Sequence, residues 1–281
     1  MKKKLITVLL IVMLVAGLGL LLYPTVADYW NSMHASRAIA NYTEAVANID
    51  DERYREMWEE AEAYNRELAG TGVNWSPDEA FMERYYSLLD VSGSGIMCYV
   101  EIPDIDVKLP VYHGTQESVL QIGAGHIAGS SLPVGGVGTH SIISGHTGLS
   151  SARLFTDLDK LHEGDIFLLN TLDETLTYQI DQIRIVLPYE LGDLALDKDQ
   201  DYVTLVTCTP YRINTHRLLV RGHRIETEKE PLAVRVTGDA LLYDPLIVAP
   251  IVAVPMLIIL LLWLLTSSRK PKKKKEEGTN Q

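Results

Sequence analysis

The chain has 281 residues, of which 47% are hydrophobic and 22% charged. This apolar content supports one sizeable core and excludes a chain that is disordered throughout. Two cysteines are too few for a disulfide framework or a four-cysteine zinc site. The formal charge is −12, and without residues 2–4 and 269–277 the middle retains 16 cations and 35 acids, a charge of −19. Such an acidic body argues against nucleic-acid binding, because it repels phosphate backbones.

Two uncharged apolar runs frame the acidic middle. Leu5 to Leu22 spans 18 residues, whereas the apolar region of a signal peptide is only ~7–15 residues, so its length favours an uncleaved anchor over cleavage after Thr25-Val26-Ala27. Leu246 to Leu265 precedes a basic tail, which favours a membrane helix over a buried core helix. Basic residues collect on the cytoplasmic side, so both termini are expected inside and residues 28–243 outside.

The outer part begins with a predicted helical arm. Residues 28–68 contain no proline or glycine and place apolar side chains at helical spacing. A break is expected at residues 48–51, where an aspartate would cap a second helix that ends at Gly70. Ser76, followed by Pro77 and Glu79, predicts the N-cap of a third helix.

After Gly95, short β-branched stretches alternate with glycine, proline and aspartate, which predicts a barrel or a sandwich. The expected strands are Ile96–Ile102, Val107–Tyr112, Thr139–Ser144, Asp165–Leu169, Leu176–Leu187, Tyr202–Cys208 and Arg217–Ile225. Two short helical pieces are expected at Ser118–Ile122 and Ala152–Leu161.

The residues able to carry chemistry lie at the ends of expected strands. Cys208 ends a β-branched run just before a proline turn, whereas Cys98 lies inside a strand and is expected to be a buried hydrophobe. A disulfide between them is an open alternative that would leave no thiol. His146 stands between glycines at positions 145 and 148 after a strand, and Arg217 begins the strand expected to pair with that of Cys208. A histidine could activate the thiol and a guanidinium could hold an oxyanion.

Together these stretches resemble the sortases. Thr204-Leu205-Val206-Thr207-Cys208, followed by Arg217, is similar to the TLxTC signature and its downstream arginine. Other stretches match class C, the pilus-polymerising sortases, in order: Ile102-Pro103, residues 109–115, Gly125-His126, residues 131–136, residues 144–146 and residues 154–159. The resemblance covers Gly95 to Ile225.

The resemblance implies a mainly β fold, a closed β-barrel of about eight strands with an N-terminal helical arm and two flanking transmembrane helices. It further implies that His146, Cys208 and Arg217 form the catalytic set. Cys208 would cleave an LPXTG-type sorting signal between Thr and Gly through a thioacyl intermediate, with His146 as acid and base and Arg217 at the carbonyl. A lysine amine of a pilin subunit would then form an isopeptide bond. Independently of the resemblance, no histidine pair has the spacing of a zinc helix and the acidic residues do not form a calcium loop, so neither a metal nor a cofactor is expected.

The expected organisation follows the chain. Residues 1–27 form a basic segment and membrane anchor, 28–94 the arm and a possible lid, 95–226 the barrel, 227–245 a linker, 246–265 the second membrane helix and 266–281 a basic cytoplasmic tail. The resemblance places the enzyme in the cell membrane of a Gram-positive-type bacterium as a two-pass protein whose catalytic domain is extracellular. Its implied partners are pilin subunits with sorting signals and acceptor lysines.

The chain departs from class C in the lid. The family's Asp-Pro-aromatic triplet is absent from residues 72–78, where Trp75 could cover the thiol without an ionic latch or could pack at the helix entry. Ser150 stands where many relatives have proline, with little expected effect. Three alternatives remain: a sortase that attaches surface proteins to peptidoglycan, a non-catalytic pilus assembly scaffold, and an L,D-transpeptidase, whose patterns do not match the surroundings of Cys208.

Overall fold

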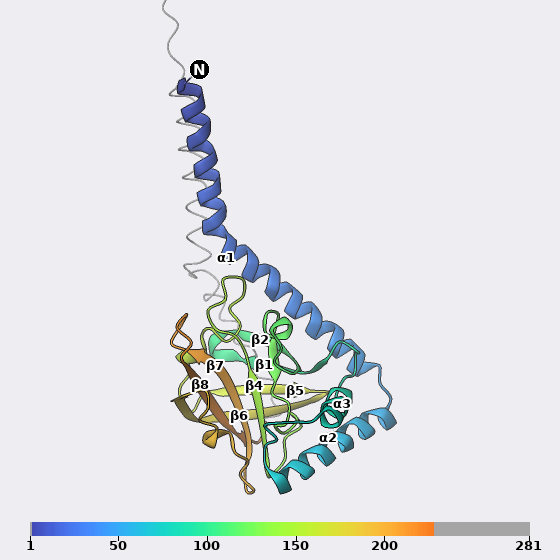
Figure 1. Ribbon diagram of the computed structural model, residues 1–281. Coiled ribbons are helices and arrows are strands. Elements are labelled where there is room, and N and C mark those ends of the chain that lie inside the picture. The colour runs from blue at the N-terminus through green and yellow to red at the C-terminus, as the bar shows by residue number, and fades with distance from the viewer. Residues whose placement is uncertain (1, 228–281) are drawn as a thin grey trace, which may run out of the picture. The chain divides into compact units, whose positions relative to one another are not determined.

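The computed structural model describes residues 2–227 (Figure 1). The expected second membrane helix, residues 246–265, and the basic tail lie outside the described residues. The helix α1 (Lys2–Ala47) contains the first apolar run and is long and apolar enough to cross a membrane, by length and composition alone. The helix continues past residue 27 into the arm, and a boundary between two compact units falls after residue 26. The described residues from 27 onward belong to one compact unit.

The arm consists of the end of α1 and two further helices, each of which begins after an aspartate cap. α2 (Asp51–Thr71) begins after Asp50, which accepts a 2.8 Å hydrogen bond from the amide of Arg53 and confirms the expected break and cap. α3 (Glu79–Ser87) is capped by Asp78, whose carboxylate accepts a 2.8 Å bond from the amide of Phe81. The prediction of Ser76 as the cap was wrong, since Asp78 is the residue directly before the first turn.

The body is a closed barrel of eight strands in the order β1-β2-β3-β4-β7-β8-β6-β5. The strands are β1 (Ile96–Ile102), β2 (Val107–His113), β3 (Ala124–His126), β4 (Thr139–Ser144), β5 (Ile166–Thr171), β6 (Glu174–Val186), β7 (Asp201–Thr209) and β8 (His216–Ile225). The expected mainly β closed barrel is therefore confirmed, and all seven predicted strands occur. Sequence patterning missed only β3, which has three residues and shows no alternation.

Short helical pieces occupy the connections. α4 (Glu117–Leu120) confirms the first expected piece, and η1 (Pro103–Ile105) and η3 (Gly192–Leu194) are single 3-10 turns. The helix expected at Ala152–Leu161 was wrong: only η2 (Leu158–Lys160) forms there. Leu154 has a φ of 43°, a left-handed backbone conformation that a right-handed helix cannot include.

One hydrophobic core joins the arm to the barrel. The barrel interior is filled by side chains with no exposed surface, among them Met97, Val111, Phe167 and Leu205. From α1, the buried Tyr42 donates a 3.0 Å hydrogen bond to the carbonyl of Met97 and accepts a 2.8 Å bond from the amide of Leu172. This ring ties the arm to both β1 and the β5–β6 turn, so the arm is part of the scaffold around the barrel.

Candidate active site

Cys208 lies near the end of β7, where the barrel wall turns toward solvent. Its thiol is free and partly exposed, while the preceding Thr207 is buried. In the antiparallel pair of β7 and β8, Cys208 lies directly opposite Arg217. Directly opposed residues of an antiparallel pair project their side chains to the same face, ~4.5–5.5 Å apart at Cβ. The expected hairpin pairing of the thiol with the guanidinium is therefore present in the register.

His146 is brought to the same end of the barrel by the parallel pair of β4 and β7. Ser144 is in register with Val206, and the peptide group of Gly145 is bonded to β7 on both sides. Its amide donates to the carbonyl of Val206 at 3.0 Å, and its carbonyl accepts from the hydroxyl of Thr207 at 2.8 Å. His146 thus leaves β4 beside the strand end that carries Cys208.

The loop after His146 is tightly held. The amide of Phe155 donates a 3.1 Å hydrogen bond to the carbonyl of His146, and the Phe155 ring is fully buried. A Cβ on Gly145 would lie 2.5 Å from that ring, so the close approach requires glycine. The arm holds the far side of the loop, because Asn31 of α1 donates a 2.7 Å bond to the carbonyl of Ser151 and Asp28 accepts a 2.8 Å bond from the amide of Arg153.

The ring of His146 contacts a carboxylate that sequence reasoning missed. Its Nε2 lies 3.4 Å from Oε2 of Glu117, and 27% of the His146 side chain is exposed. Glu117 occupies the first turn of α4 and also accepts a 2.5 Å hydrogen bond from Gln121. The two residues are 29 positions apart, and no motif or spacing links them, so only the folded chain reveals the pair.

The guanidinium of Arg217 contacts backbone carbonyls at the strand start. Its Nη1 donates to His216 at 3.1 Å and to Asn214 at 3.4 Å. Within residues 2–227 no carboxylate forms an ion pair with Arg217, so its positive charge is available to a ligand. A fixed guanidinium opposite a thiol can hold a carbonyl oxygen as it gains negative charge.

The second cysteine is unlike the first. Cys98 lies inside β1, has no exposed surface, and is a free thiol, so the alternative of a Cys98–Cys208 disulfide is wrong for this structure. Burial raises the pKa of the Cys98 thiol far above its ordinary value. Cys98 is therefore the small buried hydrophobe that its position predicts, and Cys208 is the cysteine that a reagent can reach.

Trp75, the possible lid residue, is 41% exposed. It lines a cavity of about 500 Å³ together with Tyr64, Leu68 and Phe81 of α2 and α3. The neighbouring Asn74 donates its amide to the carbonyl of Gly129 at 2.9 Å, which fixes the segment to the loop after β3. None of the three candidate catalytic residues lines this cavity, and the lid role of Trp75 stays a prediction.

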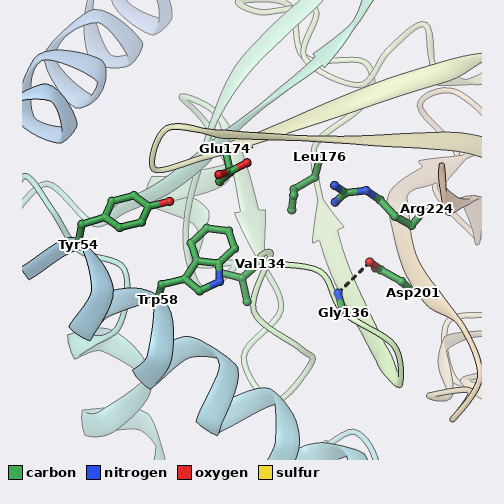
Figure 2. A pocket seen from close by; sticks show the side chains of 8 residues that line it. All are labelled: Tyr54, Trp58, Val134, Gly136, Glu174, Leu176, Asp201 and Arg224. Atoms are coloured by element: carbon green, nitrogen blue, oxygen red, sulfur yellow. Dashed lines mark hydrogen bonds between the residues drawn. The ribbon is translucent and has the colours of Figure 1, made fainter. Parts of the chain in front are cut away.

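A second cavity lies at the opposite ends of β7 and β8. Figure 2 shows its lining, in which Tyr54 and Trp58 of α2 face Asp201 and Arg224 across about 570 Å³. Asp201 accepts a 2.8 Å hydrogen bond from the amide of Gly136, and burial raises the pKa of its carboxyl. This lining contains no cysteine or histidine, so the cavity is separate from the candidate active site.

The part of the chain that the structure describes contains no group of three or more His, Cys, Asp and Glu side chains able to hold a metal ion. The expectation that the chain needs neither metal nor cofactor stays a prediction.

Comparison with known proteins places this fold among the sortases. The family model described as the sortase domain matches residues 100–225. Sortase A of Streptococcus agalactiae serotype III (strain NEM316) is 30% identical over 131 residues, 46% of this chain and 52% of that protein, so the chain spans about half the length of this relative. Sortase A of Bacillus anthracis is 22% identical over 227 residues, 81% of this chain and 98% of that protein.

Solved structures match the chain at higher sequence identity. Sortase C1 from Streptococcus agalactiae is 51% identical with a TM-score of 0.67, and the match covers 68% of this chain and 100% of that one. Sortase C from Streptococcus pneumoniae is 45% identical with a TM-score of 0.61, and the match covers 68% of this chain and 97% of that one. A closed barrel of eight strands is the fold that this chain shares with these solved sortases, and Cys208 and Arg217 are paired within it. The chain belongs to the sortase family, and the expected resemblance is confirmed.

Proposed function

We propose that the chain is a membrane-anchored class C sortase that joins pilin subunits through isopeptide bonds. The observation that carries the proposal is the register that sets Cys208 opposite Arg217 while Gly145, next to His146, is bonded to the same strand. Nucleophile, base and oxyanion donor thus come from three elements of one rigid wall, as covalent acyl transfer requires.

In the first half-reaction the sulfur of Cys208 attacks the Thr carbonyl carbon of an LPXTG-type signal, and a C–S bond forms. Arg217 holds the oxygen as it becomes an oxyanion. When the tetrahedral intermediate collapses, the C–N bond to Gly breaks, and His146 gives its proton to the leaving amine. The products are a thioacyl enzyme and the released C-terminal fragment of the signal.

In the second half-reaction a lysine amine of the next pilin attacks the thioacyl carbon. His146, now neutral, takes a proton from the attacking nitrogen. The C–S bond breaks, the thiolate of Cys208 is restored beside a protonated His146, and an isopeptide bond remains. The cycle uses only the side chains of this enzyme and its two substrates, and it ends in the protonation state in which it began.

Three observations support pilin as the acceptor and the membrane as the location. Solved structures that are 40–51% identical to this chain are class C sortases, and one of them is described as coming from a pilus island. The apolar part of α1 supports an anchor, and the basic residues at both ends of the sequence are the reason for placing both termini inside and the catalytic domain outside. The acidic middle of the chain could favour the approach of lysine-bearing partners, although mere solubility is the simpler reason for that charge.

The test is to incubate the full chain, in detergent or in vesicles, with a pilin that carries a sorting signal and with a peptidoglycan precursor as competing amine. The proposal predicts a ladder of covalent pilin multimers that Cys208→Ala abolishes and Cys98→Ala preserves. Pilin joined only to the precursor would instead assign cell-wall attachment. Pilus assembly that is unchanged in Cys208→Ala would support the non-catalytic scaffold.

A further inference from the structure

We propose that Glu117 is a positioning residue for His146: its carboxylate holds Nε2 of the imidazole, so that Nδ1 is the ring nitrogen presented for proton transfer. The inference rests on the proposed function in one respect, the role of His146 as acid and base. The contact itself is a feature of the fold, with 3.4 Å between Nε2 and Oε2.

The position of Glu117 is fixed by how α4 packs on the barrel. α4 lies against β3, where a Cβ on Gly125 would lie 3.3 Å from the side chain of Leu120 and would clash with the carbonyl of Gly114. Glycine at 125 therefore lets the helix sit close to the strand. Gly125 is in register with Ser144 on β4, two residues before His146. The chain thus sets the first turn of α4 beside the end of β4.

The carboxylate is oriented as well as placed. Gln121, one turn along, donates a 2.5 Å hydrogen bond to Oε1 of Glu117, which leaves Oε2 for the histidine. The hydrogen bonds from Gln121 and then His146 lower the pKa of the Glu117 carboxyl, so it is ionised at neutral pH. An ionised carboxylate can only accept hydrogen bonds, so the facing Nε2 must be the donor.

This polarity decides what the other ring nitrogen can do. A neutral imidazole carries one N–H, and with Nε2 donating to Glu117 the lone pair lies on Nδ1. Nδ1 can then take the proton of an incoming amine, and the carboxylate stabilises the imidazolium that results, as an orienting carboxylate does in other nucleophile–histidine pairs. Because 71% of the Glu117 side chain is exposed, we expect orientation to be its main contribution.

The experiment compares Glu117→Ala, Glu117→Gln and Glu117→Asp with the parent, and uses Glu163→Gln, at an exposed turn, as the control for charge. Turnover of sorting peptide by the full chain is measured for each variant, and the ¹⁵N shifts of His146 are recorded for the same variants in a Cys208→Ala background at alkaline pH, where the imidazole is neutral and has one N–H. We expect the Nε2–H tautomer in the parent and a mixture in Glu117→Ala, with kcat about 10- to 100-fold lower and KM within about twofold. Glu117→Gln retains an acceptor and should keep the tautomer with an intermediate kcat, and Glu117→Asp should restore part of the rate.

Four results would overturn the proposal: an Nδ1–H tautomer in the parent, an unchanged kcat in Glu117→Ala, a lower kcat with an unchanged tautomer, or a change only in KM for the amine, which would assign Glu117 to acceptor binding. Failure of the proposed function gives a different pattern. In that case neither the parent nor any variant turns over peptide, while the ¹⁵N shifts still decide whether Glu117 holds the ring.

Discussion

Cys208 and Arg217 face each other directly across the antiparallel pair of β7 and β8. Each of these strands is hydrogen-bonded to a neighbour on both sides in the closed barrel. The residues next to the pair, Thr207 and Leu218, are buried. The relative position of thiol and guanidinium is therefore set by backbone hydrogen bonds rather than by flexible loops. Such preorganisation costs nothing at the moment of reaction, which is what stabilisation of an oxyanion requires.

Replacement of Arg217 by lysine should lower acyl transfer by about 10²–10³-fold. Lysine keeps the charge but loses the planar fork of donors that spans a carbonyl oxygen. The measurement is kcat for release of the Gly fragment, with Arg212→Lys, in the exposed turn between β7 and β8, as the control. Parent-like turnover in Arg217→Lys would show that the guanidinium is not needed.

The two thiols should differ in reactivity. Iodoacetamide should label Cys208 and leave Cys98 unmodified in the folded chain, because Cys98 is buried and its thiolate is disfavoured by a raised pKa. Peptide mapping by mass spectrometry checks this, and labelling in denaturant should reach both residues. Modification of Cys98 before unfolding would contradict the burial on which the assignment of the nucleophile depends.

Gly145→Ala should harm activity more than folding. The added Cβ would lie 2.5 Å from the buried ring of Phe155, so the loop that carries His146 must shift. Overpacking of this kind costs about 1–3 kcal/mol. Peptide turnover should be largely lost while urea unfolding shows a cooperative fold, and Gly192→Ala, which meets nothing within 4 Å, serves as the control. Equal turnover in the two variants would refute the tight loop.

Acid should destabilise the barrel through two buried histidines. Desolvation lowers the pKa of His126 and of His140 to about 4, below the ordinary value of 6.5. Their neutral rings are hydrogen-bonded to Tyr85 and Thr204, respectively. The unfolded chain binds these protons first, so their stabilisation is complete above pH 6.5 and is lost as the pH falls toward 4.

Each histidine should contribute a loss of about 1.4 kcal/mol per pH unit over that window. Urea unfolding between pH 7.5 and 5.5 measures the slope above the ordinary range of carboxyl groups, and NMR should find both rings neutral at pH 5.5. A flat unfolding free energy over this range, or rings that titrate near 6.5, would contradict the burial of the two histidines.

Local patterns predicted the parts of the fold that are local. Strands such as Thr139–Ser144 can be predicted because β-branched residues lie between glycines and other residues that end a strand. The carboxylate at position 50 marks the start of a helix. β3 was not predicted, because the three residues Ala-Gly-His form a strand only through their pairing with β2 and β4. The expected cap at Ser76 was wrong because a nearby aspartate offers a better acceptor at the position that precedes the turn.

The candidate site likewise has one part that local sequence predicts and one part that it does not. Cys208 and Arg217 could be paired from sequence, since a short turn joins their strands and hairpin pairing is local. The neighbours of His146 could not be predicted, because Glu117 and Asn31 reach its ring and its loop across 29 and 120 residues. Such contacts depend on how closed strands and a long arm pack, which no pattern within a short window specifies.

The most direct test of the account is the identity of the acylated residue. The full chain is incubated with a peptide carrying an LPXTG-type signal and no acceptor amine, then quenched in acid and mapped by mass spectrometry. The account predicts the acyl fragment, ending at Thr, as a thioester on Cys208, with no adduct in Cys208→Ala and an undiminished adduct in Cys98→Ala. An adduct on any other residue, or cleavage that persists in Cys208→Ala, would contradict it.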